Sequence, residues 1–200
     1  MDRMRTCGVC DVGSIPTGGT LGGETANIMA KKIFITGISG TGKTTIENTL
    51  NSNGIYSIGI DEWPNLCFWK NKTTGEKVEY EAKLDKTFID AHDWICDIKI
   101  LKNLLEQNER IIVVLGSSSN QNDFLNLFDK ILLLQCKPET FIKRIIERKD
   151  NDFGKDKSAQ ELILSWYEEF ENNLLKKGAV PINTDKPLKK VVENIMKEIQ

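Results

Sequence analysis

From Lys31 onward, short apolar runs alternate with amphipathic stretches. The apolar runs are rich in β-branched and aliphatic residues, which predicts strands, and the stretches between them have helical spacing. This alternation is typical of parallel βαβ construction with helices on both faces of a sheet. The five predicted strands cover residues 31–36, 56–61, 111–116, 130–136 and 179–185.

The intervening segments predict helices. Leu162, Trp166, Phe170 and Leu174 recur at four-residue spacing and form one apolar stripe of a helix that should end at Gly178. The expected fold is an α/β protein, a three-layer α/β/α sandwich around a five-stranded parallel sheet. The other predicted helices cover residues 44–52, 94–107, 138–149 and 187–199.

Residues 1–28 differ from the rest of the chain. They are rich in Gly and Thr and lack a periodic apolar pattern, which predicts a disordered or extraneous tail before a domain over 29–200. The run VGSIPTGGT at 12–20 back-translates into a string resembling the T-arm and acceptor end of a transfer RNA. Read-through from an upstream gene, with Met29 as the natural start, and a genuine flexible leader both stay open.

Composition and charge narrow the function classes. Lysine and arginine number 27 against 29 aspartates and glutamates, so the net charge of −2 argues against a nucleic-acid-coating protein. No run approaches the roughly 20 apolar residues that span a bilayer, so no membrane partner is expected. Five scattered cysteines indicate reduced thiols and a cytoplasmic location rather than a disulfide framework.

The strongest chemical signal is GISGTGKT at residues 37–44, which matches G-x-x-x-x-G-K-[ST] between a predicted strand and a predicted helix. Glycines let successive backbone N–H groups point at phosphate, and the helix N-terminus adds partial positive charge. Lys43 is expected to reach the β- and γ-phosphates of ATP, and the Thr44 hydroxyl to ligate magnesium (Mg²⁺). The predicted nucleotide-binding residues are Gly37, Ser39, Gly40, Thr41, Gly42, Lys43, Thr44 and Thr45.

This cradle alone does not specify the reaction. A GTPase would need N-K-x-D, whereas the chain has Asn71-Lys72-Thr73-Thr74, and an AAA+ or helicase motor would need further modules. Arg144 and Arg148 share one face of a predicted helix, and arginine is preferred for holding phosphate or stacking on a base. A solvated helix face is the alternative for this arginine pair.

With these motifs in view, residues 31–200 resemble the nucleoside-monophosphate-kinase-like group of P-loop kinases, which includes adenylate, shikimate and gluconate kinases. The resemblance rests on GISGTGKTT, RIIER and NTDKPL, and it implies the P-loop NTPase fold with a lid over about 149–158. The chain also resembles small bacterial kinase-like ATPases, through the sequences LCFW and NDFGK and a following tryptophan. By resemblance, Arg144 would flank the adenine, Arg148 would touch phosphate, Lys155 would reach the transferring phosphoryl, and Asp185 would border the adenine.

The sequence departs from that group after the third strand. LGSSSNQNDF replaces the D-G-x-P-R of adenylate kinases, which puts an AMP-type acceptor in doubt, and no Walker B aspartate follows IIVVLG. Asp61, at the end of the second predicted strand, is therefore expected to act as the catalytic base and to help hold magnesium. Its alternative role is to cap the segment that follows.

The acceptor side is expected to lie at about 62–110, a region that reads as mostly polar and helical with a turn at 71–75. Trp69 there is expected either to stack on a base or to pack in the core. His92 is expected on a solvated helix position, and Asp93 with Asp97 on a polar helix face.

The predicted function is transfer of the γ-phosphoryl of ATP to a small-molecule acceptor such as a nucleoside, a nucleotide or a similar metabolite. An ATPase or regulatory nucleotide-binding module without such an acceptor is the main alternative. A kinase acting on nucleic-acid ends is disfavoured by the near-neutral charge. The sequence leaves the oligomeric state open.

Overall fold

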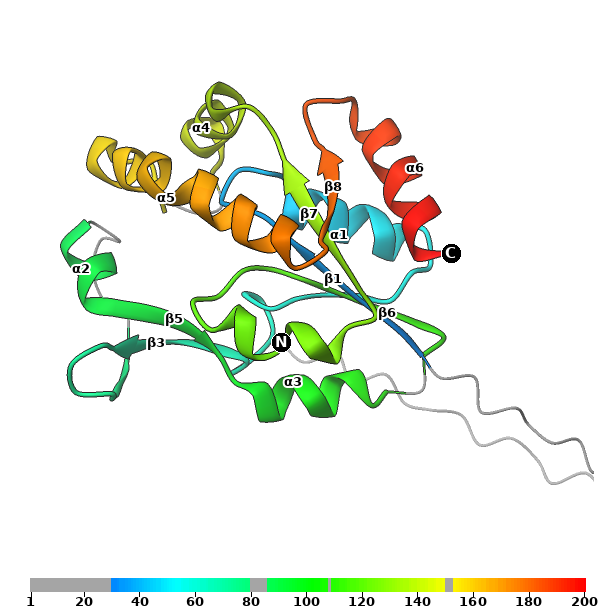
Figure 1. The fold of residues 1–200 in the computed structure, drawn as a ribbon, viewed down its shortest axis with the longest axis horizontal. Helices are drawn as coiled ribbons and strands as arrows, with labels where there is room; N and C mark the ends of the chain where they lie inside the picture. The colour runs from blue at the N-terminus through cyan, green and yellow to red at the C-terminus, as the bar shows by residue number, and fades with distance from the viewer. Residues whose placement is uncertain (1–29, 80–85, 108, 150–152) are drawn as a thin grey trace, which may run out of the picture.

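The computed structural model describes residues 30–79, 86–107, 109–149 and 153–200 (Figure 1). The predicted tail at 1–28 lies outside the described residues, as does part of the predicted lid at 150–152. No helix in the described part of the chain is long and apolar enough to cross a membrane.

A five-stranded parallel sheet lies at the centre of the domain, as the pattern predicted (Figure 1). Its strand order is β2-β6-β1-β7-β8, so the strand before the P-loop is central and flanked by β6 and β7. The central strands are apolar and buried, as strands covered on both faces must be. The strands are β1 (Lys31–Thr36), β2 (Ser57–Gly59), β6 (Ile111–Leu115), β7 (Lys130–Gln135) and β8 (Val180–Asn183).

Helices cover both faces of this sheet, which confirms the three-layer sandwich. On β1, Ile33 and Ile35 join the core cluster under α1 and α6, whereas Phe34 joins the cluster that includes residues of α3. This opposite assignment follows from the two-residue period of a strand. The helices are α1 (Lys43–Ser52), α2 (Lys86–Ala91), α3 (Ile98–Leu105), α4 (Pro138–Glu147), α5 (Lys157–Lys176) and α6 (Leu188–Ile199).

The region 62–110 is not mostly helical, and that expectation was wrong. It contains a three-stranded antiparallel sheet, here called the accessory sheet, in the order β4-β3-β5 (Figure 1). Its strands are β3 (Cys67–Asn71), β4 (Lys77–Val78) and β5 (His92–Cys96). Aromatic and β-branched side chains paired across β3 and β5 favour strands, which the polar composition of the region had hidden.

The turn predicted at 71–75 is confirmed, because Gly75 N donates to Asn71 O at 2.9 Å. The helix predicted from Trp94 starts later, at Ile98. The Asp97 carboxylate caps it by accepting hydrogen bonds from Lys99 N at 2.9 Å and Ile100 N at 3.1 Å.

Three residues expected on a helix therefore lie elsewhere. His92 and Asp93 are on β5, and Asp97 is the N-cap of α3, so Asp93 and Asp97 do not share a helix face. His92 is half-buried rather than solvated.

The loop after β6 fastens the accessory sheet to the main domain. Ser119 N donates to Trp94 O at 2.7 Å. The Asn120 side chain accepts from Cys96 N at 2.9 Å and donates to Cys96 O at 2.9 Å, so it imitates a neighbouring strand. The unusual sequence LGSSSNQNDF is thus the attachment point of the accessory sheet.

Candidate functional site

The loop between β1 and α1 has the backbone of a phosphate cradle. Gly40 and Gly42 adopt φ angles of 83° and 99°, which favour glycine, and a Cβ on Gly40 would lie 2.6 Å from Phe141 O. Gly42 is the N-cap of α1 and supplies no side-chain hydrogen bond to it. The N-terminus of α1 therefore remains suited to bind an anion such as phosphate.

Lys43 folds back over this loop. Its Nζ donates to Gly37 O at 2.7 Å and to Ile38 O at 3.1 Å. Burial lowers the pKa of Lys43 to about 8; the charge of Asp61 opposes this shift and the charge of Arg148 adds to it. A phosphate in the loop would give the ammonium the anionic partner that it lacks among these carbonyls.

The hydroxyl side chains of the loop play different parts. Thr41 is buried and its Oγ1 donates to Ile38 O at 2.7 Å, so it stabilises the loop. Thr44 and Thr45 are exposed and line the cleft described next. Among the described residues, no three His, Cys, Asp or Glu side chains gather as metal ligands. Thr44 and Asp61, the residues that the sequence predicts to hold magnesium, both line that cleft, and their metal-binding role stays a prediction.

A cleft of about 1260 Å³ begins at the P-loop and extends to the accessory sheet. Its lining includes the P-loop, the end of β8 and residues of the α4–α5 segment, and also Asp61, residues of α2 and the accessory sheet. The cleft therefore brings the phosphate-binding loop and the accessory sheet into one cavity.

Arg144 connects α4 to the P-loop and to the end of β8. Its Nη2 donates to Thr184 O at 2.8 Å, and its Nη1 donates to Gly40 O at 3.4 Å. Arg148 donates from Nη1 to Ser39 Oγ at 3.1 Å and from Nη2 to Phe153 O. Both arginines thus face the P-loop rather than a solvated helix face, and their roles toward ATP stay predictions.

Three predicted site residues, Gly37, Lys155 and Asp185, are absent from the described lining of the cleft. The Asp185 carboxylate accepts from Lys137 N at 3.2 Å, and a hydrogen bond from Thr140 lowers the pKa of this carboxyl. Among the described residues, Thr184 and Lys186 line the cleft in its place. Lys155 lies just before α5, where its carbonyl accepts from Gln160 Nε2 at 3.0 Å, and it is also absent from the described lining.

Asp61 follows β2 and lies in the cleft, where the sequence placed it. Its Oδ1 accepts a hydrogen bond of 2.9 Å from Trp94 Nε1, so the accessory sheet orients this carboxylate. Sequence reasoning missed the Trp94 contact because it placed Trp94 on a helix. Trp69 lines the cleft and also packs against Trp94, with ring centroids 5.1 Å apart.

Comparison with known families identifies the P-loop domain. A family model described as an AAA domain matches residues 33–165, which include the P-loop, the accessory sheet and both arginines. No curated protein sequence matches the chain. The sequence predicts that the chain is not an AAA+ or helicase motor, because it lacks the further modules of a motor. The family match does not test this prediction.

Solved structures with a similar fold include small-molecule kinases. TT1252 from Thermus thermophilus is 14% identical, with a TM-score of 0.54 over 85% of this chain and 96% of that one. A shikimate kinase from Bacteroides thetaiotaomicron is 18% identical, with a TM-score of 0.51 over 84% and 97%. A deoxyadenosine kinase from M. mycoides is 22% identical, with a TM-score of 0.50 over 84% and 97%. These structural matches establish the fold, and they confirm the predicted structural resemblance to this kinase group.

Proposed function

The chain belongs to the AAA domain family, and from that premise we propose that it is a kinase that transfers the γ-phosphoryl of ATP to a hydroxyl of a small acceptor. The observation that carries this proposal is the shared cleft. Asp61 lies in the same cavity as the P-loop, on the side of the accessory sheet, where an acceptor has room.

In this proposal, bound ATP with magnesium supplies the transferable phosphoryl group. The P-loop N–H groups and Lys43 would bind the phosphates and stabilise the charge that develops during transfer. Thr44 and Asp61 would hold the metal, and Arg144 and Arg148 would fix the nucleotide between α4 and the loop. Asp61 also aims the acceptor hydroxyl and takes its proton, held in place by Trp94 Nε1.

The likeness to shikimate and deoxyadenosine kinases supports a small-molecule acceptor over a macromolecular one. The test is ADP formation by the full chain with ATP and magnesium, measured with and without a panel of nucleosides, nucleotides, sugars and hydroxy acids. Acceptor-dependent ADP formation that disappears in Lys43→Ala supports the kinase. Equal ADP formation without any acceptor overturns it in favour of an ATPase.

A further inference from the structure

The cleft residues that come from 61–94 form the acceptor wall, the surface that faces the P-loop from the accessory-sheet side. Lys72 and His92 are the basic side chains among the described residues of this wall. Their hydrogen bonds decide whether the wall offers a cation to an incoming anion.

The Lys72 ammonium is held by contacts with α2 and with Asp93. Its Nζ donates to Asp90 O at 2.9 Å and to Ile89 O at 3.2 Å, and it lies 3.8 Å from Asp93 Oδ1. Two of the three ammonium donors are thus used by carbonyls, and the Asp93 carboxylate lies at ion-pair distance. Lys72 therefore caps the carbonyls at the end of α2 and partly neutralises Asp93.

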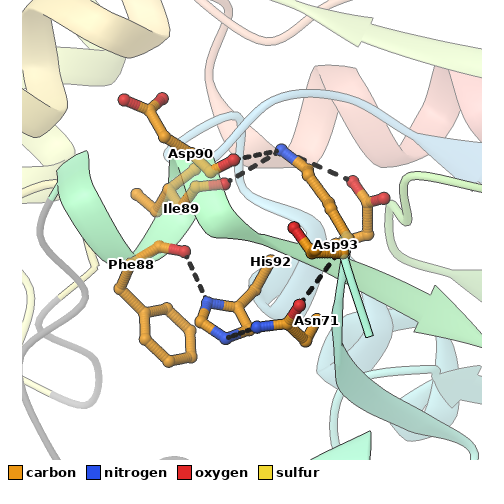
Figure 2. Close-up of polar contacts among 8 residues, drawn as sticks. Asn71, Phe88, Ile89, Asp90, His92 and Asp93 are labelled. Atoms are coloured by element: carbon orange, nitrogen blue, oxygen red, sulfur yellow. Dashed lines mark hydrogen bonds and ion pairs between the residues drawn. The ribbon is translucent and has the colours of Figure 1, made fainter. Parts of the chain in front are cut away.

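Both nitrogens of the His92 ring have hydrogen-bond partners within the protein. Asn71 Oδ1 accepts from Thr73 N and Thr74 N, both at 2.9 Å, so the Asn71 Nδ2 group is the one that faces His92. An Asn71 N–H then donates to His92 Nε2 at 3.3 Å, which places the ring proton on Nδ1, 2.8 Å from Phe88 O (Figure 2).

Carboxylates outnumber cations on the wall. Asp61, Glu62, Asp90 and Asp93 line it, against Lys72 alone among its described lysines and arginines. Lys86 pairs with Asp90 on an exposed turn of α2. A second phosphate or a carboxylate bound here would therefore meet negative charge and no uncommitted cation of the described wall.

The wall also offers apolar surface. Trp69 and Trp94 line it with rings tilted 51° to each other, and Trp69 further packs edge-on against Phe88. Tryptophan faces bind planar rings by stacking and bind ammonium groups through their quadrupole. Aromatic faces beside carboxylates suit a neutral or cationic molecule.

We propose that the acceptor is a hydroxyl compound without negative charge, and that the acceptor wall rejects its phosphate- or carboxylate-bearing analogues. A nucleoside would supply a planar neutral ring, and an amino sugar would supply an ammonium; both meet the same chemistry. This inference rests on the proposed kinase function. It separates the chain's acceptor from an AMP-type nucleotide or a sugar acid.

The test compares matched pairs in binding and in turnover. Cytidine is compared with its 5′-monophosphate, and glucosamine with its 6-phosphate, by calorimetry on the full chain with magnesium and a non-hydrolysable ATP analogue. In at least one pair, the member without negative charge is expected to bind at least about tenfold more tightly. Asp93→Asn is expected to reduce this difference in affinity at least about threefold, because it removes one carboxylate beside Lys72. Glu106→Gln removes an exposed charge at the end of α3 and serves as the control.

The outcomes separate the two proposals. Preference for the uncharged or cationic member without any rise in ADP formation supports the acceptor wall and overturns the kinase. ADP formation stimulated by the anionic members, or their equal or tighter binding, supports a kinase and overturns this inference. Binding of none of the four compounds also overturns it, since both permitted chemistries would have failed.

Discussion

Lys43 contacts loop carbonyls in the positions that a bound polyphosphate would compete for. Burial lowers its pKa to about 8, and phosphate favours the charged ammonium, so ATP binding should raise this pKa. We therefore expect ATP binding to take up protons at pH 8 and above. Affinity should fall as pH rises through this range, by at most about tenfold per pH unit for one proton.

This linkage is measured by calorimetric titration of ATP in two buffers that differ in ionisation enthalpy, at pH 7 and pH 8.5. Lys43→Arg keeps the charge without a titrating group and is the control, in which this proton uptake should vanish. Uptake that is unchanged in Lys43→Arg would assign the proton to another group.

Asp61→Asn tests the proposed base. Asparagine can still accept the hydrogen bond from Trp94 Nε1, so the local structure should persist while the proton acceptor is lost. We expect kcat to fall by about 10²–10⁴ while the chain still binds ATP, as for loss of a positioned base. Glu62→Gln, a charge-matched neighbour, should keep most activity. Steady-state kinetics of Asp61→Asn near those of the parent chain would leave Asp61 as a cap only.

Individual residues were predictable where a local motif dictated their position. The P-loop could be read from spacing alone because its glycine conformations and its lysine are fixed within eight residues. The Trp94–Asp61 contact could not, because it joins residues 33 positions apart through an unpredicted strand. Asp185 was assigned by resemblance, and its hydrogen bonds to the turn before α4 hold it away from the cleft.

At the scale of elements, Asn120 is one of the side chains that attach the accessory sheet to the main domain, and its removal should separate stability from chemistry. Asn120→Ala deletes the hydrogen bonds to both backbone groups of Cys96, while leaving the P-loop untouched. We expect the free energy of unfolding to fall by about 1–3 kcal/mol and the KM for the acceptor to rise, with the KM for ATP unchanged. Urea unfolding measures the free energy, and two-substrate kinetics measure the two KM values. Equal changes in the KM for ATP and the KM for the acceptor would contradict the proposal that the accessory sheet contacts only the acceptor.

The α4–α5 segment depends on the planar fork of Arg148, which donates to Ser39 Oγ and Phe153 O together. A lysine places one charge at that position and cannot reproduce both directions. We expect Arg148→Lys to lower kcat more than about threefold. Lys143→Arg, at an exposed position on the same helix, is the matched control. A kcat within twofold of the parent chain would show that turnover does not need the fork of Arg148.

Elements of the main sheet were predictable because burial on both faces gives continuous apolar runs, such as IIVVL in β6. The accessory strands gave no such signal. Cys67–Asn71 is only partly buried, and its partner β5 starts directly after α2, so periodicity alone assigned this region to helices.

At the scale of the whole molecule, hydrogen bonds fix the described domain from its first strand onward. Lys31 N donates to Arg110 O at 3.0 Å and Lys32 N to Asp129 Oδ2 at 2.7 Å, so β1 is anchored from its first residue. The sandwich, the P-loop and the acceptor wall are all built from residues 30–200. A chain that starts at Met29 should therefore contain the complete proposed site.

We expect deletion of residues 1–28 to change Tm by less than about 4 °C, the shift that 1 kcal/mol causes in a domain of this size. ATP affinity and acceptor-dependent ADP formation should match those of the full chain purified in parallel. Differential scanning calorimetry and ATP titration provide the measurements. A Tm lower by more than about 8 °C would show that these residues stabilise the domain by roughly 2 kcal/mol or more. Lower turnover at unchanged Tm would instead indicate that they contribute to the cleft.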